Sequence, residues 1–107
     1  MSAMTTVALT IEPEAQERLD ELGLQAAFDQ MIDHVRQAAP GLLRIEVSFP
    51  PEYDVGYRMV VIEATMAATD EEYETITEDW EQWYITLPPE VREHLVIGSY
   101  REESNGR

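Results

Sequence analysis

The chain has 107 residues, no cysteine and a net charge of −15, because 22 acidic residues oppose seven basic ones, all of them arginine. A length of this order corresponds to one domain, and the lack of cysteine excludes disulfides, thiolate zinc sites and thiol nucleophiles. No apolar run reaches the ~20 residues of a membrane helix, and the N-terminus lacks the basic and apolar regions of a signal peptide. We therefore expect a cytoplasmic protein, and the lysine-free, arginine-rich composition is typical of a GC-rich bacterial gene.

The charge balance also limits the possible partners. Nucleic-acid affinity comes largely from Lys and Arg that displace counterions from phosphates, so a field this negative predicts no nucleic-acid partner. The same field attracts basic proteins and speeds their encounter. The ordinary alternative is that the acids only keep the protein soluble.

The first half of the chain alternates between strand and helix patterns. Residues 6–11 alternate apolar and polar side chains, which predicts a half-buried strand. Pro13 suits the first turn of a following helix, and Gly23 is expected to cap or kink it. A second helical stripe over residues 24–39 ends before a Pro-Gly pair. Residues 43–49 alternate again, which places Leu43, Ile45, Val47 and Phe49 on the buried face of a strand.

The second half again contains strand and helix patterns, after a turn-rich loop over residues 50–56. Residues 57–65 are expected to be extended, and the capping-box spacing of Thr69 and Glu72 predicts a helix that starts near Asp70. The pattern leaves open whether residues 83–87 continue this helix or form a strand. A short helical turn over 90–94 and a last strand over 95–101 complete the domain, and residues 102–107 are expected to be a frayed tail.

The resulting order of elements is strand, helix, strand, strand, helix, strand. This order predicts an α+β fold with the ferredoxin-like βαββαβ arrangement, in which two main helices pack on one face of an antiparallel sheet. The expected core contains most of the apolar residues on the inward faces: Val7, Leu9, Leu19, Leu22, Phe28, Ile32, Val35, Leu43, Ile45, Val47, Phe49, Val60, Ile62, Ile76 and Trp80.

Residues 6–35, read as strand, helix, glycine and helix, resemble the opening of a ribbon-helix-helix repressor. The resemblance implies DNA contacts from the outward residues of the strand, with basic residues around them. Those outward residues would be Thr6, Ala8 and Thr10, and the nearest bases are Arg18 and Arg36 among many acids. This composition argues against a DNA-reading strand.

The acidic helix that starts near Asp70 is the candidate binding surface, because no basic residue occurs between Arg58 and Arg92. Its carboxylates lack the spacing of a calcium loop, so they predict either a solvated face or a docking surface for a basic partner. Trp83 is a candidate interface anchor, since Trp is enriched at binding hot spots. The predicted partner-binding residues are Asp70, Glu71, Glu74, Glu78, Glu81 and Trp83.

Catalytic and metal signatures are missing from the sequence. His34 and His94 lie far apart and fall in no metal-binding motif. There is no nucleophile-elbow serine, no phosphate-binding glycine loop and no lysine for a Schiff base. We therefore expect no catalytic residues, no metal and no cofactor, although so many carboxylates do not exclude an acid/base pair.

Two functions remain open. The first is a small, non-catalytic interaction protein that binds or inhibits a basic protein, as an antitoxin or a nuclease inhibitor does. The second is a homodimeric ferredoxin-like domain that binds a small ligand or acts as an enzyme through its uncovered sheet face. An apolar outer sheet face would favour the second function, whereas a polar face beside an acidic, aromatic groove would favour the first.

Overall fold

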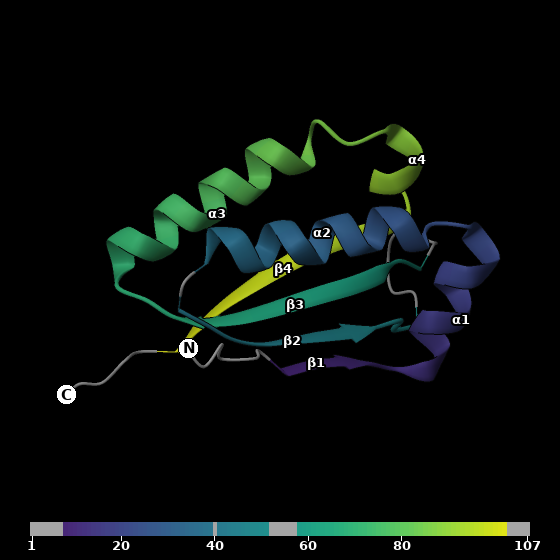
Figure 1. Ribbon diagram of the computed structural model, residues 1–107, viewed down its shortest axis with the longest axis horizontal. Coiled ribbons are helices and arrows are strands. Elements are labelled where there is room, and N and C mark those ends of the chain that lie inside the picture. The colour runs from purple at the N-terminus through teal and green to yellow at the C-terminus, as the bar shows by residue number, and fades with distance from the viewer. Residues whose placement is uncertain (1–7, 40, 52–57, 103–107) are drawn as a thin grey trace, which may run out of the picture.

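A computed structural model describes residues 8–39, 41–51 and 58–102 of the chain (Figure 1). They form one small α+β domain with a four-stranded sheet. The elements in chain order are β1 (Ala8–Ile11), α1 (Pro13–Leu22), α2 (Gln25–Ala38), β2 (Leu42–Ser48), β3 (Val60–Ala67), α3 (Asp70–Tyr84), α4 (Pro89–Arg92) and β4 (Leu95–Glu102).

The expected antiparallel, ferredoxin-like sheet is wrong. The strands lie in the order β1-β2-β3-β4, and the sheet is mixed: β1 is parallel to β2, β2 is antiparallel to β3, and β3 is parallel to β4. Each helical crossover therefore joins two neighbouring strands, whereas the ferredoxin-like arrangement places another strand between them. The alternation of side chains sets which face of a strand is buried, but it does not set which strand lies beside it.

The helices begin and end where local signals place them. Pro13 lies in the first turn of α1, and Gly23 closes that helix in the left-handed conformation, with φ 70°, as the sequence predicts. The capping box of α3 is formed by Thr69 and Glu72. Of the ambiguous residues 83–87, the first two end α3 and the other three form a turn, so this segment is not a strand.

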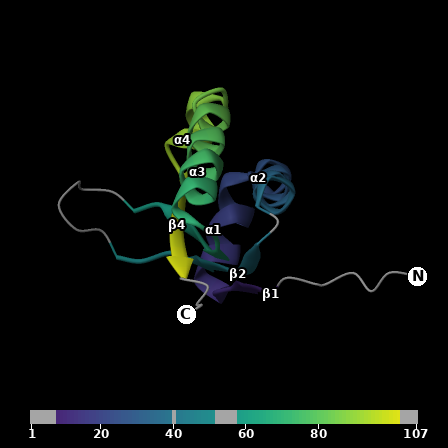
Figure 2. The ribbon, with the colours of Figure 1, turned by 90° about the vertical axis from the view of Figure 1, so that its left-hand side faces the viewer.

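Helices α2 and α3 lie on the same side of the sheet, as the two views show together (Figures 1 and 2). The core lies between this helical layer and the inward face of the strands. Ten of its predicted members are buried: Leu19, Phe28, Ile32, Val35, Ile45, Val47, Val60, Ile62, Ile76 and Trp80. Further buried positions are supplied by small residues and methionines, among them Ala15, Met31, Ala64 and Met66.

Two predicted core residues are exposed, each for a local reason. The pairing of β2 with β3 shifts register between Leu42 and Arg44, so Leu42 is buried and Leu43 is 41% exposed. Leu9 is 37% exposed because β1 is an edge strand, outside the part of the sheet that α2 and α3 cover (Figure 2). Leu22 and Phe49 are half-buried, and Val7 lies outside the described residues.

In the described part of the chain, no helix is both long enough and apolar enough to cross a membrane.

Candidate functional site

The acidic helix α3 is fixed at its start by reciprocal hydrogen bonds. The Glu72 amide donates to Thr69 Oγ1 over 3.1 Å, and the Thr69 amide donates to Glu72 Oε1 over 3.0 Å. Asp70 and Glu71 occupy the same first turn, where negative charge is favoured by the helix dipole. The first acids of the helix thus stabilise it locally, whereas Glu74, Glu78 and Glu81 lie beyond the reach of that effect.

Two tyrosines hold α3 against the last strand. The Tyr73 hydroxyl donates to the carbonyl of Ser99 over 3.0 Å, and the Tyr84 hydroxyl donates to the carbonyl of Leu95 over 2.6 Å. Both carbonyls belong to β4, which is one of the two edge strands of the sheet. Helix α3 therefore runs beside β4 in the opposite direction, with its tyrosines reaching the outer edge of the strand.

A stripe of acids runs along α3 on this same side. Asp70, Glu74, Thr77 and Glu81 have the i, i+4, i+7, i+11 spacing of one helical face. The two ends of the stripe are placed by contacts, because Asp70 forms an ion pair with Arg101 of β4 and Glu81 lines a cavity beside that strand. Glu74 therefore lies on the β4 side as well, and its side chain is exposed.

A cavity of about 270 Å³ separates α3 from β4 between the two tyrosine contacts. Its lining from α3 is Thr77, Trp80, Glu81 and Tyr84, and its lining from β4 is Val96, Ile97 and Ser99. Trp80 is only 3% exposed, yet its Nε1 has no hydrogen-bond partner among the described residues.

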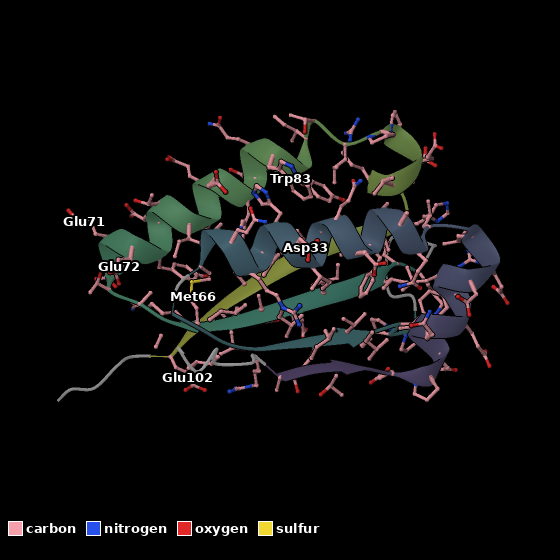
Figure 3. The ribbon with its side chains drawn as sticks, viewed as in Figure 1. Asp33, Met66, Glu71, Glu72, Trp83 and Glu102 are labelled. Carbon is pink, nitrogen blue, oxygen red and sulfur yellow. The ribbon has the colours of Figure 1, made fainter. Side chains whose placement is uncertain are left out.

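The remaining predicted site residues lie elsewhere on the helix. At ~100° per residue, Glu71 and Glu78 fall on the outer ridge of α3, away from β4. Figure 3 shows Glu71 and Glu72 at the N-terminal end of α3, and Trp83 near its C-terminal end on the side toward α2. The structure thus brings Asp70, Glu74 and Glu81 together beside β4, but it does not place Trp83 among them.

Trp83 instead belongs to a contact between α2 and α3. Its ring stacks on the imidazole of His34, with centroids 4.1 Å apart and planes 5° from parallel. His34 Nε2 also lies 3.0 Å from Asp79 Oδ2. A histidine beside a carboxylate is one part of many catalytic sites. The hydroxyl residue in the cavity beside this pair is Thr75. Its hydroxyl group already donates a hydrogen bond to the carbonyl of Glu71. We read this cluster as a helix-to-helix contact.

The outer face of the sheet carries polar contacts of its own. Arg44 of β2 contacts Glu102 over 3.0 Å, and Tyr100 of β4 approaches Glu63 of β3 at 3.4 Å. The charge of Glu63 is the main cause of a raised pKa at Tyr100, with partial burial and this hydrogen bond acting in the same direction. The face also carries Leu43 and Tyr100, which are 41% and 54% exposed, so it mixes apolar and charged groups.

A larger cavity of about 700 Å³ lies at the start of α3, beside the junction of Gly41 with the end of β3. Its walls include Ala67, Ala68 and Ile76, with Glu71 and Glu72 on the helix side. In the described residues, no three His, Cys, Asp or Glu side chains gather closely enough to hold a metal ion, here or elsewhere.

Trp80 is among the residues that the sequence places in the core, and Tyr73 and Tyr84 share its face of α3 at helical spacing. Their spacing shows which face of α3 packs inward, and that part is confirmed for the buried Trp80. What the spacing does not show is that β4 is an edge strand, because that follows from strand pairing. Tyr53 and Tyr57 lie outside the described residues.

Comparisons of the chain with protein-family models, with curated proteins and with solved structures find no match.

Proposed function

We propose that this protein is a non-catalytic interaction protein that binds, and thereby restrains, a basic protein partner through α3. The observation that carries the proposal is the charge on the exposed side of that helix. Glu71, Glu74, Glu78 and Glu81 form no ion pair among the described residues. Like charges three or four residues apart on a helix each destabilise it by a few tenths of a kcal/mol. A basic partner would relieve this repulsion.

The charged groups on the outer face of the sheet support the same function. The Arg44–Glu102 ion pair and the contact of Tyr100 with Glu63 would have to be desolvated in a sheet-to-sheet homodimer, whereas the centre of such an interface is depleted of charge. The cavity between α3 and β4 is lined by the acidic Glu81 and the aromatic Trp80 and Tyr84, as expected for an inhibitor of a basic protein. The net charge of −15 argues against a nucleic-acid partner.

The test compares two charge-reversal variants of equal net charge. One carries Glu74→Arg and Glu78→Arg on α3. The other carries Glu17→Arg and Glu21→Arg, an exposed i, i+4 pair on α1 whose single ion pair, to Arg18, is solvent-exposed and contributes little. Wild type and both variants are used to capture proteins from lysate of the source cells, and each captured protein is then purified and its binding kinetics are measured at two salt concentrations.

We expect a basic protein whose association with wild type is fast and falls steeply with salt. The α3 variant should associate about tenfold more slowly at low salt and show a flatter salt dependence, because exposed charges act mainly on the encounter and are screened over ~8 Å. The α1 variant should behave as wild type. Equal effects of the two variants, or none, would show that α3 is only a solvated face.

A further inference from the structure

The outer edge of β4 presents backbone groups in a fixed alternation. The Val60 amide of β3 donates to the carbonyl of His94 over 2.8 Å, so His94 and every second residue after it direct their backbone groups toward β3. Leu95, Ile97, Ser99 and Arg101 therefore direct theirs to the open edge. The tyrosine hydroxyls on the Leu95 and Ser99 carbonyls agree with this alternation.

Between the two tyrosine contacts, the backbone of Ile97 faces outward. No strand among the described residues pairs with this edge of β4. The strand has eight residues, pairs with β3 without a register shift and contains no proline. Natural proteins blunt exposed edges with bulges, prolines, lysines or a covering element. Apart from the tyrosine contacts and the ion-paired Arg101 at its end, β4 shows none of these devices, and it is therefore suited to accept a further strand.

The chemistry beside the edge indicates what that strand carries. Side chains of an added strand that point to the helix side would pass the acidic stripe of Asp70, Glu74 and Glu81. One of them would reach the cavity of about 270 Å³, where the Glu81 carboxylate can accept hydrogen bonds from an Arg or Lys side chain. Basic residues at alternating positions would complement the stripe, whereas acidic ones would be repelled.

We propose that β4 accepts an extended, basic segment of the partner as a fifth strand, with alternate Arg or Lys side chains facing α3. This proposal rests on the proposed function, because it names how the basic partner is held. Backbone hydrogen bonds along β4 supply affinity, and the acidic stripe of α3 selects the side chains.

A second copy of the chain is the competing occupant, since two β4 edges could pair antiparallel around a two-fold axis. That arrangement would bring two α3 helices, each with the same acidic stripe, to the same side of one continuous sheet. Each copy carries a net charge of −15. Like charges facing each other are unfavourable, so the charge favours a basic strand over self-pairing.

The test uses the intact protein and a synthetic seven-residue peptide of alternating arginine and threonine, capped at both ends. Two further peptides are N-methylated, one at the arginines and one at the threonines. If the arginine side chains face α3, the arginine amides point to β4 in an antiparallel addition, whereas the threonine amides point to β4 in a parallel one. Methylation thus removes the hydrogen bonds to β4 in one pattern only, at equal charge.

We expect the unmodified peptide to bind and to slow solvent exchange of the Ile97 and Ser99 amides in NMR spectra. One methylation pattern should weaken binding by about tenfold or more, and the other should leave it nearly unchanged. The same peptide with glutamate in place of arginine should not bind. If both methylated peptides bind as the unmodified one does, or lose affinity equally, strand addition is overturned.

The outcomes separate this proposal from the function on which it rests. If peptide binding depends on salt but is the same for all three methylation states, α3 remains a surface for a basic partner and only the added strand is overturned. Failure of the α3 charge reversal with the captured partner would overturn the function itself. A concentration-dependent dimer that protects the Ile97 amide without peptide would also overturn the added strand, in favour of self-pairing.

Discussion

The imidazole of His34 lies flat on the indole of Trp83, with ring centroids 4.1 Å apart, and this contact joins α2 to α3. Asp79 lies one turn before Trp83, and its Oδ2 is 3.0 Å from Nε2 of the same imidazole. Stacked aromatic pairs contribute roughly 0.5–1.5 kcal/mol beyond their buried area. The contact therefore fixes the acidic helix relative to the rest of the helical layer, and it gives Trp83 a structural role.

The first prediction concerns this pair. His34→Ala should lower the free energy of unfolding by about 1–2 kcal/mol, because it removes both the stack and the Asp79 contact. Trp83→Ala should cost about 2–3 kcal/mol, at the low end for a tryptophan because the ring is only half-buried. Urea unfolding of both single variants and the double variant measures the coupling.

The control is His94→Ala, since His94 forms no aromatic stack among the described residues. It should change stability by less than either variant of the pair. Additive effects of His34→Ala and Trp83→Ala would contradict a direct interaction between the two rings.

The second prediction tests the irregular pairing of β2. Val47 is 1% exposed on the inward face, so Val47→Asp should prevent folding by placing an unpaired charge in the core. Leu43→Asp should be tolerated, because the register shift turns Leu43 outward. Circular dichroism and the urea midpoint of the two variants decide between this structure and unbroken alternation, which would make both substitutions equally harmful.

This pair also shows what the sequence can predict. Strict alternation over residues 43–49 correctly predicts a strand with Ile45 and Val47 buried. It fails at Leu43, because a bulge adds one residue to one strand and shifts the face of everything before it. Nothing in the side-chain pattern marks that position, since Leu42 and Leu43 are identical in chemistry.

The order of helices and strands follows from local signals, but their pairing does not. The capping box at Thr69 and the glycine cap at Gly23 are each fixed by a few neighbouring residues, and both are confirmed. Parallel pairing of β3 with β4 depends on residues more than 30 positions apart, such as Val60 and Leu95. The candidate groove depends on that pairing, so the sequence predicted its acids and aromatics without predicting that they line one strand edge.

The third prediction compares two glycines. A side chain at Gly41 would press into the carbonyl oxygen of Ala67, whose amide already donates to the Gly41 carbonyl over 2.8 Å. Gly41→Ala should therefore destabilise the protein by about 1–3 kcal/mol. Gly98→Ala on β4 meets no atom within 4 Å and should be neutral or stabilise by up to about 1 kcal/mol. Thermal unfolding of both variants checks the difference. A Gly41→Ala variant as stable as wild type would contradict the close approach of the backbone at Gly41 to that at Ala67.

The last prediction concerns the outer face of the sheet, where Tyr100 is 54% exposed beside Glu63. The charge of Glu63 raises the pKa of Tyr100 above its ordinary value of about 10. Because the neutral phenol is favoured in the folded state, this group contributes stability that is fully present below about pH 10 and is lost as the pH rises through the raised folded pKa.

The phenolate absorbance of wild type minus that of Tyr100→Phe isolates this titration from the other tyrosines. In that difference, Glu63→Gln should move the pKa of Tyr100 down toward 10, because it removes the first and largest cause of the shift. Glu90→Gln, a change of equal charge on α4, should leave the titration where it is. If both substitutions shift it equally, the cause is the net charge of the protein and not the contact between β3 and β4.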